Sequence, residues 1–206
     1  GANTTGGDNV AMGYNALDAN TTGADNTAIG TQALTGNTTA SNNTAVGKNS
    51  LKVNTTGENN TAVGSLALDA NTTGIQNVGI GINALGANTT ASNNVGVGTN
   101  ALLSNTTGTQ NVAVGTFSLD ANTTGNYNVA VGGETLTDLT TGSFNTAVGD
   151  GAAANTTTAS NNSAFGSGSL LTNTTGADNT GIGKDALRAN TTGESNVAVG
   201  SQSLDA

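Results

Sequence analysis

The chain has 206 residues and a net charge of -9, and it contains no His and no Cys. These absences remove the commonest general base, the commonest metal ligand and every disulfide or thiolate site. Four Lys and Arg residues in all are too few to hold nucleic acid by its phosphates. No apolar run approaches the ~20 residues of a membrane span. We therefore expect neither nucleic-acid binding nor membrane insertion by this segment.

A 17-residue repeat covers the chain without any insertion or deletion. The stretch NTTGADNTAIGTQAL, residues 20–34, returns as NTTGENNTAVGSLAL from Asn54 and as NTTGADNTGIGKDAL from Asn173. Stacked coils require such a register, because one extra residue would break the alignment with the next coil. Residues 1–206 are therefore predicted to be one repeat domain, and we expect it to be a fragment of a longer fibre. When repeat position 1 is set at Asn3, the twelve repeats begin at residues 3, 20, 37, 54, 71, 88, 105, 122, 139, 156, 173 and 190.

The recurring residues indicate short strands separated by turns. Asn at position 7, Gly at position 11 and Thr at positions 2 and 3 occur in all twelve repeats, and Leu occupies position 15 in eleven, with Ala153 the exception. Alternating Asn-Val-Ala-Val-Gly and paired Thr do not fit helical periodicity. The pattern predicts an all-β parallel β-solenoid with strands at positions 7–11, 14–16 and 1–3. Coils ~4.8 Å apart would form a rod ~55 Å long.

The alternation also predicts which side chains face the core. We expect Val, Ile and Leu at positions 8, 10 and 15 to point inward, so position 9 should face outward. Position 9 holds nine Ala and three Gly, which restricts size and excludes polarity. This predicts close packing against another chain. The predicted interface comprises Ala11, Ala28, Ala45, Ala62, Gly79, Gly96, Ala113, Ala130, Ala147, Ala164, Gly181 and Ala198.

Two further columns have structural interpretations. The Asn side chains at position 7 are expected to form a hydrogen-bonded ladder along the rod. A row of cation ligands is the alternative, but no column of carboxylates accompanies them. The Gly at position 11 indicates either a positive φ or a close approach of backbones. We therefore expect no metal site and no cofactor.

The repeats resemble the heads of YadA-like trimeric autotransporter adhesins. The motif is an Asn, any residue, Ala or Gly, Val or Ile, and Gly, as in NTAIG at 26–30, NVGIG at 77–81 and NVAVG at 196–200. Similar repeats occur in phage and viral tail fibres. The resemblance implies a left-handed parallel β-roll, a side-by-side homotrimer and a place on a cell or virion surface. Those heads run nearer fourteen residues per coil, so the added NTT segment leaves a triangular β-helix as an alternative cross-section.

The expected function is that of a structural shaft or head of an extracellular fibre or adhesin. A tail-fibre segment of the same architecture is the alternative. An enzyme is not expected, because the Ser residues lack an activating base and no carboxylate pair recurs. An ice-binding solenoid is a minor alternative. Its usual chemistry is two outward rows of Thr, but adjacent residues on a strand point to opposite sides, which would leave one row outward. The partners are copies of the same chain, side by side or end to end, and a host surface protein or glycan.

Three residues mark a predicted contact patch. Tyr127 and Phe144 share position 6 in successive repeats, so their rings should lie one above the other at a turn. Leu139 occupies position 1 of the ninth repeat, where ten other repeats have Asn. Exposed apolar clusters and aromatic side chains are typical of binding surfaces. Separately, Ala153 should leave a gap in the Leu column, which Phe165 of the next coil is predicted to fill.

Overall fold

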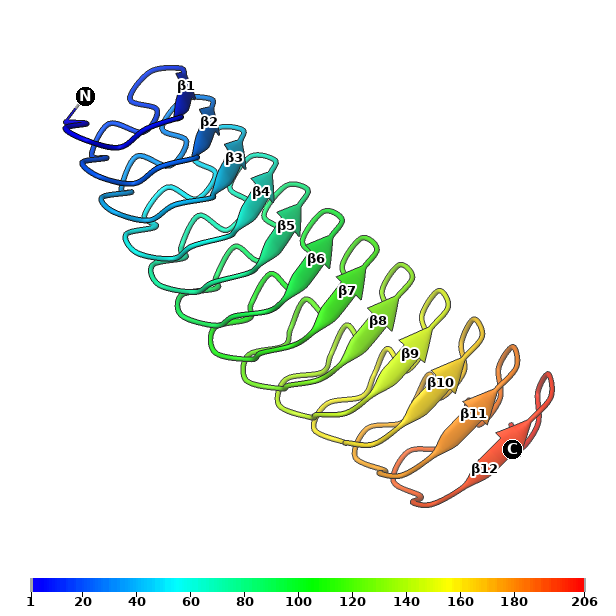
Figure 1. Ribbon diagram of the computed structural model, residues 1–206. Coiled ribbons are helices and arrows are strands. Elements are labelled where there is room, and N and C mark those ends of the chain that lie inside the picture. Colours follow the sequence, from blue (N-terminus) through cyan, green and yellow to red (C-terminus); the bar gives the residue numbers. More distant parts are fainter. Residues whose placement is uncertain (1, 206) are drawn as a thin grey trace.

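The protein is a parallel β-solenoid with one short strand in each coil. The computed structural model describes residues 2–205, and within them it contains twelve strands and no helix (Figure 1). The strands form a single parallel sheet in which each pairs with the next along the chain. They are β1 (Val10–Met12), β2 (Thr27–Ile29), β3 (Thr44–Val46), β4 (Thr61–Val63), β5 (Val78–Ile80), β6 (Val95–Val97), β7 (Val112–Val114), β8 (Val129–Val131), β9 (Thr146–Val148), β10 (Ser163–Phe165), β11 (Thr180–Ile182) and β12 (Val197–Val199).

The pairing register confirms the 17-residue coil. Val112 of β7 lies opposite Val129 of β8, and every other strand pair has the same offset. Each strand covers positions 8–10, the centre of the first predicted strand segment. The strands predicted at positions 14–16 and 1–3 are wrong, because these segments are turns and bends. They still bond to the next coil, as when the N–H of Leu102 donates to the carbonyl of Ser118 over 3.1 Å.

The strand faces are the reverse of the prediction. Position 9 is buried in eleven of the twelve repeats, whereas positions 8 and 10 are half-buried or exposed. Only in the first coil is position 9 exposed. The predicted chain–chain interface at position 9 is therefore wrong, because these residues lie in the core of their own coil stack. They are Ala28, Ala45, Ala62, Gly79, Gly96, Ala113, Ala130, Ala147, Ala164, Gly181 and Ala198 inside the core, and Ala11 at the exposed end.

The narrowness of the coil explains the small side chains at position 9. A Cβ added to Gly79 would lie 3.0 Å from the carbonyl oxygen of Ala84 and 3.2 Å from Cγ of Leu68. The opposite wall of the coil thus leaves room for Ala or Gly only. A period-2 pattern fixes which residues share a face, and the available space then decides which face is inside. Val and Ile at positions 8 and 10 are excluded from this core by their size.

The Leu at position 15 is buried as expected in every repeat that has it except the last, where Leu204 is exposed, but its backbone is left-handed. Its φ lies between 47° and 55° in all twelve repeats, including Ala153. This region is uncommon for residues with a Cβ and costs roughly 1–3 kcal/mol for each residue. Leu102 tolerates it because its side chain is fully buried and its N–H is hydrogen-bonded to the next coil. The apolar seam of the core is therefore built from left-handed residues, and positions 6 and 13 of every coil have a positive φ as well.

Both interpretations of the Gly at position 11 are confirmed. Its φ lies between 126° and 140° in all twelve repeats. A Cβ on Gly98 would lie 2.4 Å from the carbonyl oxygen of Gly115 in the next coil. No other residue type combines this conformation with such a close approach. The Gly column lets the chain leave the strand sharply while the coils stay in contact.

Two columns of buried Asn run along the interior. At position 7, Asn94 accepts at Oδ1 from the N–H of Asn111 (2.9 Å), and its Nδ2 donates to the carbonyl of Gly108 (2.8 Å). At position 1, Nδ2 of Asn105 donates to the same carbonyl (2.9 Å) and to Oδ1 of Asn88 (3.1 Å). The predicted ladder at position 7 is confirmed. A second ladder at position 1 meets it at the position-4 carbonyl, whereas the sequence pattern predicts position 1 to be part of a strand.

Candidate interaction surfaces

The outer face of the sheet is an uncharged strip along the rod, with one mixed row of Val, Thr and Ser and one row that is apolar throughout. Because position 9 points inward, the side chains of positions 8 and 10 form two parallel outer rows. Neither row contains a charged residue in any repeat. Val114, near the middle of the rod, is 37% exposed, and Phe165 of β10 is 39% exposed. We call these two rows the sheet face. Its first row is Val10, Thr27, Thr44, Thr61, Val78, Val95, Val112, Val129, Thr146, Ser163, Thr180 and Val197, and its second is Met12, Ile29, Val46, Val63, Ile80, Val97, Val114, Val131, Val148, Phe165, Ile182 and Val199.

The predicted packing of Phe165 against Ala153 is wrong for the same reason. Phe165 lies on the sheet face, whereas Ala153 is buried with 1% exposure. The two side chains are on opposite sides of the coil wall. Phe165 therefore enlarges the apolar row and fills no gap in the core.

A second surface consists of Thr at positions 2 and 3. The position-3 side chains are exposed in all twelve repeats, and those at position 2 are half-buried or exposed. Both rows reach the surface because this segment is a bend, so the expectation of a single outward row is wrong. The position-2 hydroxyl donates to the next coil, as from Oγ1 of Thr106 to the carbonyl of Thr123 (3.1 Å). We call these two rows the Thr face.

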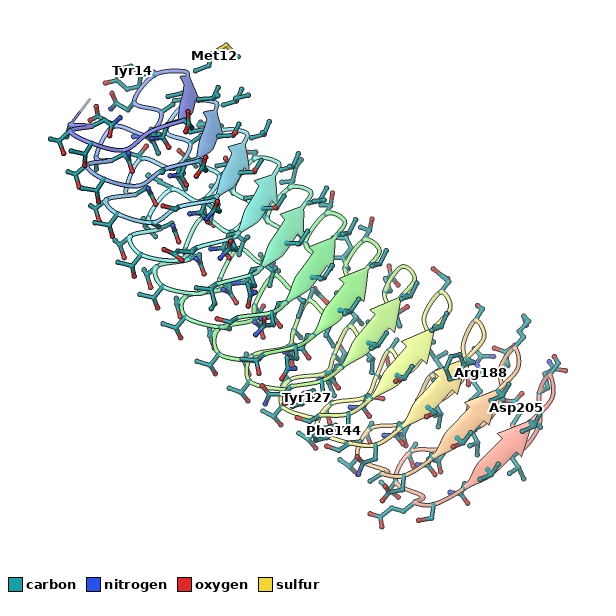
Figure 2. All side chains as sticks on the ribbon, in the orientation of Figure 1. Met12, Tyr14, Tyr127, Phe144, Arg188 and Asp205 are labelled. Carbon is teal, nitrogen blue, oxygen red and sulfur yellow. The ribbon has the colours of Figure 1, made fainter. Side chains whose placement is uncertain are left out.

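The predicted aromatic pair is stacked at the surface. The ring centroids of Tyr127 and Phe144 lie 5.0 Å apart with an interplanar angle of 5°. The residues are 47% and 59% exposed (Figure 2). Backbone bonds between coils hold them in place, since the N–H of Phe144 donates to the carbonyl of Asn126 (3.1 Å). The stacking prediction is confirmed, and the two rings remain candidates for a contact with a partner.

Leu139 does not belong to this patch. Its side chain is fully buried within the core. Position 1 faces the interior, where the other repeats place the inner Asn ladder. The interpretation of Leu139 as an exposed contact residue is therefore wrong. The burial of position 1 also means that most Asn-Thr-Thr sequences keep their Asn amide inside the coil, as at Asn105.

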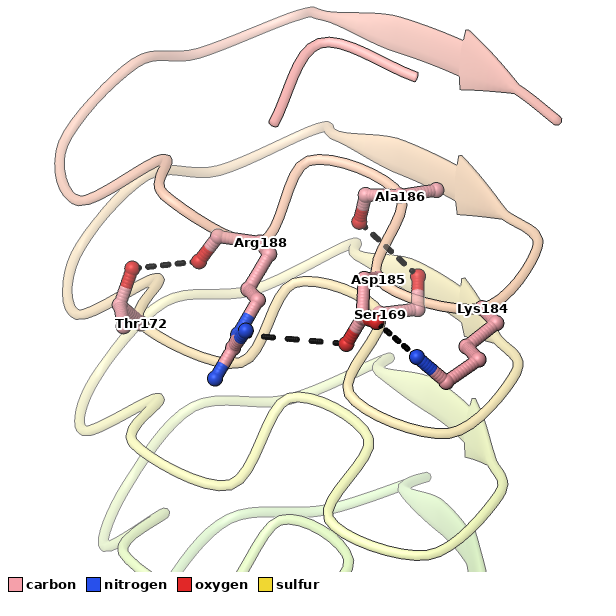
Figure 3. A network of polar contacts seen from close by, with 6 residues as sticks. All are labelled: Ser169, Thr172, Lys184, Asp185, Ala186 and Arg188. Atoms are coloured by element: carbon pink, nitrogen blue, oxygen red, sulfur yellow. Dashed lines mark hydrogen bonds and ion pairs between the residues drawn. The ribbon is translucent and has the colours of Figure 1, made fainter. Parts of the chain in front are cut away.

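A small charged network occupies the turns of the tenth and eleventh coils (Figure 3). The carboxylate of Asp185 accepts a hydrogen bond from Lys184 and lies 3.9 Å from Nε of Arg188. The hydrogen bond from Lys184 lowers the pKa of Asp185 below its ordinary value, although desolvation opposes this. At the other charged site, burial raises the pKa of Asp69, opposed by backbone hydrogen bonds and by Lys52. Both carboxylates lie in turns between coils.

A hollow of about 300 Å³ lies at the last coils, lined by Leu187, Asn190, Asn196 and Leu204 among others. It opens where the next coil would cover these side chains elsewhere in the stack. Within residues 2–205, no group of three or more His, Cys, Asp and Glu side chains is placed to hold a metal ion. The same part of the chain has no helix with the length and apolar character needed to cross a membrane.

Comparisons with known proteins identify no relative of the chain. No protein-family model matches the chain. Searches of the curated proteins and of the solved structures also found no match.

Proposed function

We propose that the chain is a rigid shaft or head segment of an extracellular fibre or adhesin, in which copies associate side by side through the sheet face. The observation that carries this proposal is the uncharged sheet face, which covers all twelve strands and whose position-10 row is apolar throughout. Large exposed apolar strips commonly mark contacts with other proteins. A chain with a net charge of -9 repels its copies, so an uncharged strip is the natural place for them to meet. The Thr face is uncharged as well, but only the sheet face carries a row of large apolar side chains.

The size of the sheet face suits an extended contact. Twelve strands spaced by ~4.8 Å make a strip ~53 Å long, and rows ~6.7 Å apart with their side chains make it roughly 10 Å wide. The resulting area of roughly 500 Å² is at the upper end for patches on monomers. A contact of this size lies below the ~800 Å² that each partner buries in a standard stable interface, so its length along the rod is what favours association.

The resemblance to YadA-like heads supports three copies and a place outside the cell. The motif in NTAIG at 26–30 has the position-9 Ala inside and Thr27 and Ile29 on the sheet face. We therefore assign the trimer contact to positions 8 and 10. A tail-fibre segment on a virion is the alternative with the same architecture. The stacked rings of Tyr127 and Phe144 are the proposed contact for a host surface protein or glycan.

Mass measurement by light scattering tests the association. The wild-type chain should have a mass of roughly 59 kDa, three times its 19.8 kDa. Replacing Val97, Val114 and Val131 together by Glu places three charges on the sheet face and should give a folded monomer. The matched control replaces Thr31, Thr99 and Thr116, exposed at position 12, by Glu and should remain a trimer. Circular dichroism checks that both variants are folded, and a monomeric wild-type chain would exclude this association.

A further inference from the structure

The Thr face varies less in residue type than other exposed positions of the repeat. Position 3 is Thr in all twelve repeats and exposed in all twelve. Other exposed positions vary widely. Position 12, for example, holds Tyr14, Lys48 and Asp150 in different repeats. Something besides solvent contact is therefore needed to explain a surface row that contains one residue type only.

The fold explains the Thr at position 2 but not the one at position 3. Along the rod, position-2 hydroxyls donate to the carbonyl of the next coil, as Thr72 does to Thr89 over 3.0 Å. Within residues 2–205, the position-3 hydroxyls make no hydrogen bond to the chain. Their hydrogen-bonding capacity and their methyl groups are both turned to the solvent. The position-3 row is thus available to a ligand.

The backbone holds both rows in a regular array. The N–H groups of Thr106 and Thr107 both donate to the carbonyl of Thr123, over 3.1 and 3.2 Å, and the Thr106 hydroxyl donates to the same oxygen over 3.1 Å. The same two backbone bonds recur between Thr123, Thr124 and Thr140. Neighbouring Thr side chains are therefore fixed at the ~4.8 Å spacing of the coils. Such an array needs little further ordering when it meets a ligand with the same repeat.

The composition of this strip narrows the chemistry of the ligand. Positions 1–4 contain no charged and no aromatic residue in any repeat. A charged polymer would find no counter-charge there, and a sugar ring would find no aromatic face to stack on. Methyl groups alternating with hydroxyls instead order the adjacent water and offer it hydrogen bonds. A ligand that suits them is uncharged, periodic and made of hydrogen-bonding groups.

We propose that the Thr face binds the surface of ice. The spacing of the coils is close to a repeat distance between oxygen atoms on ice planes, so water ordered over successive Thr methyl groups can join the lattice. The hydroxyls of positions 2 and 3 anchor that water. The contact extends over twelve coils, so many weak interactions add up along one rigid surface. The Thr face and the sheet face comprise different residues, so ice binding and side-by-side association are separate properties.

Ice recrystallisation and thermal hysteresis assays test the proposal directly. The wild-type chain should inhibit recrystallisation and shape growing ice crystals. Replacing Thr90, Thr107 and Thr124, three consecutive position-3 residues, by Lys should raise the concentration needed for inhibition at least tenfold. The matched control replaces the exposed position-12 residues Thr31, Thr99 and Thr116 by Lys and should leave inhibition unchanged.

A second set of variants separates loss of binding from loss of folding. Replacing Thr90, Thr107 and Thr124 by Ser removes only the methyl groups and should weaken inhibition while the circular dichroism spectrum stays unchanged. Absence of any ice activity in the wild-type chain would overturn the proposal, as would an equal loss in the position-12 control. Retention by crystalline cellulose with no effect on ice would indicate a polysaccharide ligand instead and would also overturn it. The light-scattering result is independent of these outcomes.

Discussion

The inner Asn ladder at position 1 is interrupted at Leu139, and Thr156 replaces Asn in the next repeat as well. In the flanking coils, Oδ1 of Asn122 and Oγ1 of Thr156 are buried without a hydrogen-bond partner. Elsewhere the Nδ2 group of the next Asn supplies the missing donor, as Asn105 does for Asn88. The same repeat has Ala153 in place of the Leu at position 15, and both residues belong to one buried cluster. The ninth repeat thus loses a Leu at one core position and gains one at another.

This exchange predicts strong coupling between Leu139 and Ala153. Leu139→Asn alone should leave a cavity beside Ala153, and Ala153→Leu alone should overpack the core against Leu139. The double variant restores the arrangement of most other coils and supplies a donor for Asn122. The free energy of unfolding of the double variant should therefore be about 1–3 kcal/mol higher than the sum of the two single effects predicts. Urea denaturation measures the cycle, and additive effects would show that the two sites do not share space.

At the scale of the strand, the sequence predicts much of the fold but not its inner face. The period of 17, the sheet, the Asn ladder at position 7 and the role of Gly at position 11 all follow from recurrence along the chain. The inner face was predicted from apolar size, which favoured Val and Ile over Ala. The deciding quantity is the distance to the opposite wall. That distance depends on the left-handed turn at position 15, which a column of Leu does not reveal.

The shape of one coil also decides which side chains reach the surface. The pairing of Tyr127 with Phe144 follows from a shared repeat position, because stacked coils bring such residues together. The prediction that Leu139 is exposed is wrong, because its position 1 is interpreted from the sequence as part of a strand and not as part of a buried Asn ladder. The sheet face could not be predicted either, because its apolar residues had been assigned to the core. Periodicity identifies neighbours along the rod, whereas burial depends on the shape of one coil.

Enlarging the inner and outer side chains of one strand should have opposite consequences. Ala113→Leu adds three carbon atoms to a core with room for Ala or Gly and should destabilise the fold by about 1–3 kcal/mol or more. Val114→Leu adds one carbon to the sheet face and should change stability by less than about 0.5 kcal/mol. Thermal unfolding of the two variants provides the comparison. A larger loss for Val114→Leu would mean that the strand is oriented the other way.

At the scale of the whole molecule, the rod is a stack in which each strand pairs only with its neighbours along the chain (Figure 1). Most backbone hydrogen bonds outside the strands also join one coil to the next. Stability in such a stack is approximately a sum of terms from each coil and from each contact between coils. A coil by itself has strained turns and few bonds of its own, so its neighbours supply most of what stabilises it.

Because each coil is bonded mainly to the coils next to it, the rod should unwind coil by coil under tension. When the two ends are pulled apart, the tension passes through every coil, and a coil at an end unwinds first because it is bonded on one side only. The chain should then unwind one coil at a time. Each coil releases 17 residues, or about 55–60 Å of extended backbone. A single-molecule pulling trace should show a series of steps of that length at similar force. One abrupt release of the entire length would show that the coils fail together, and such a rod could not dissipate energy gradually.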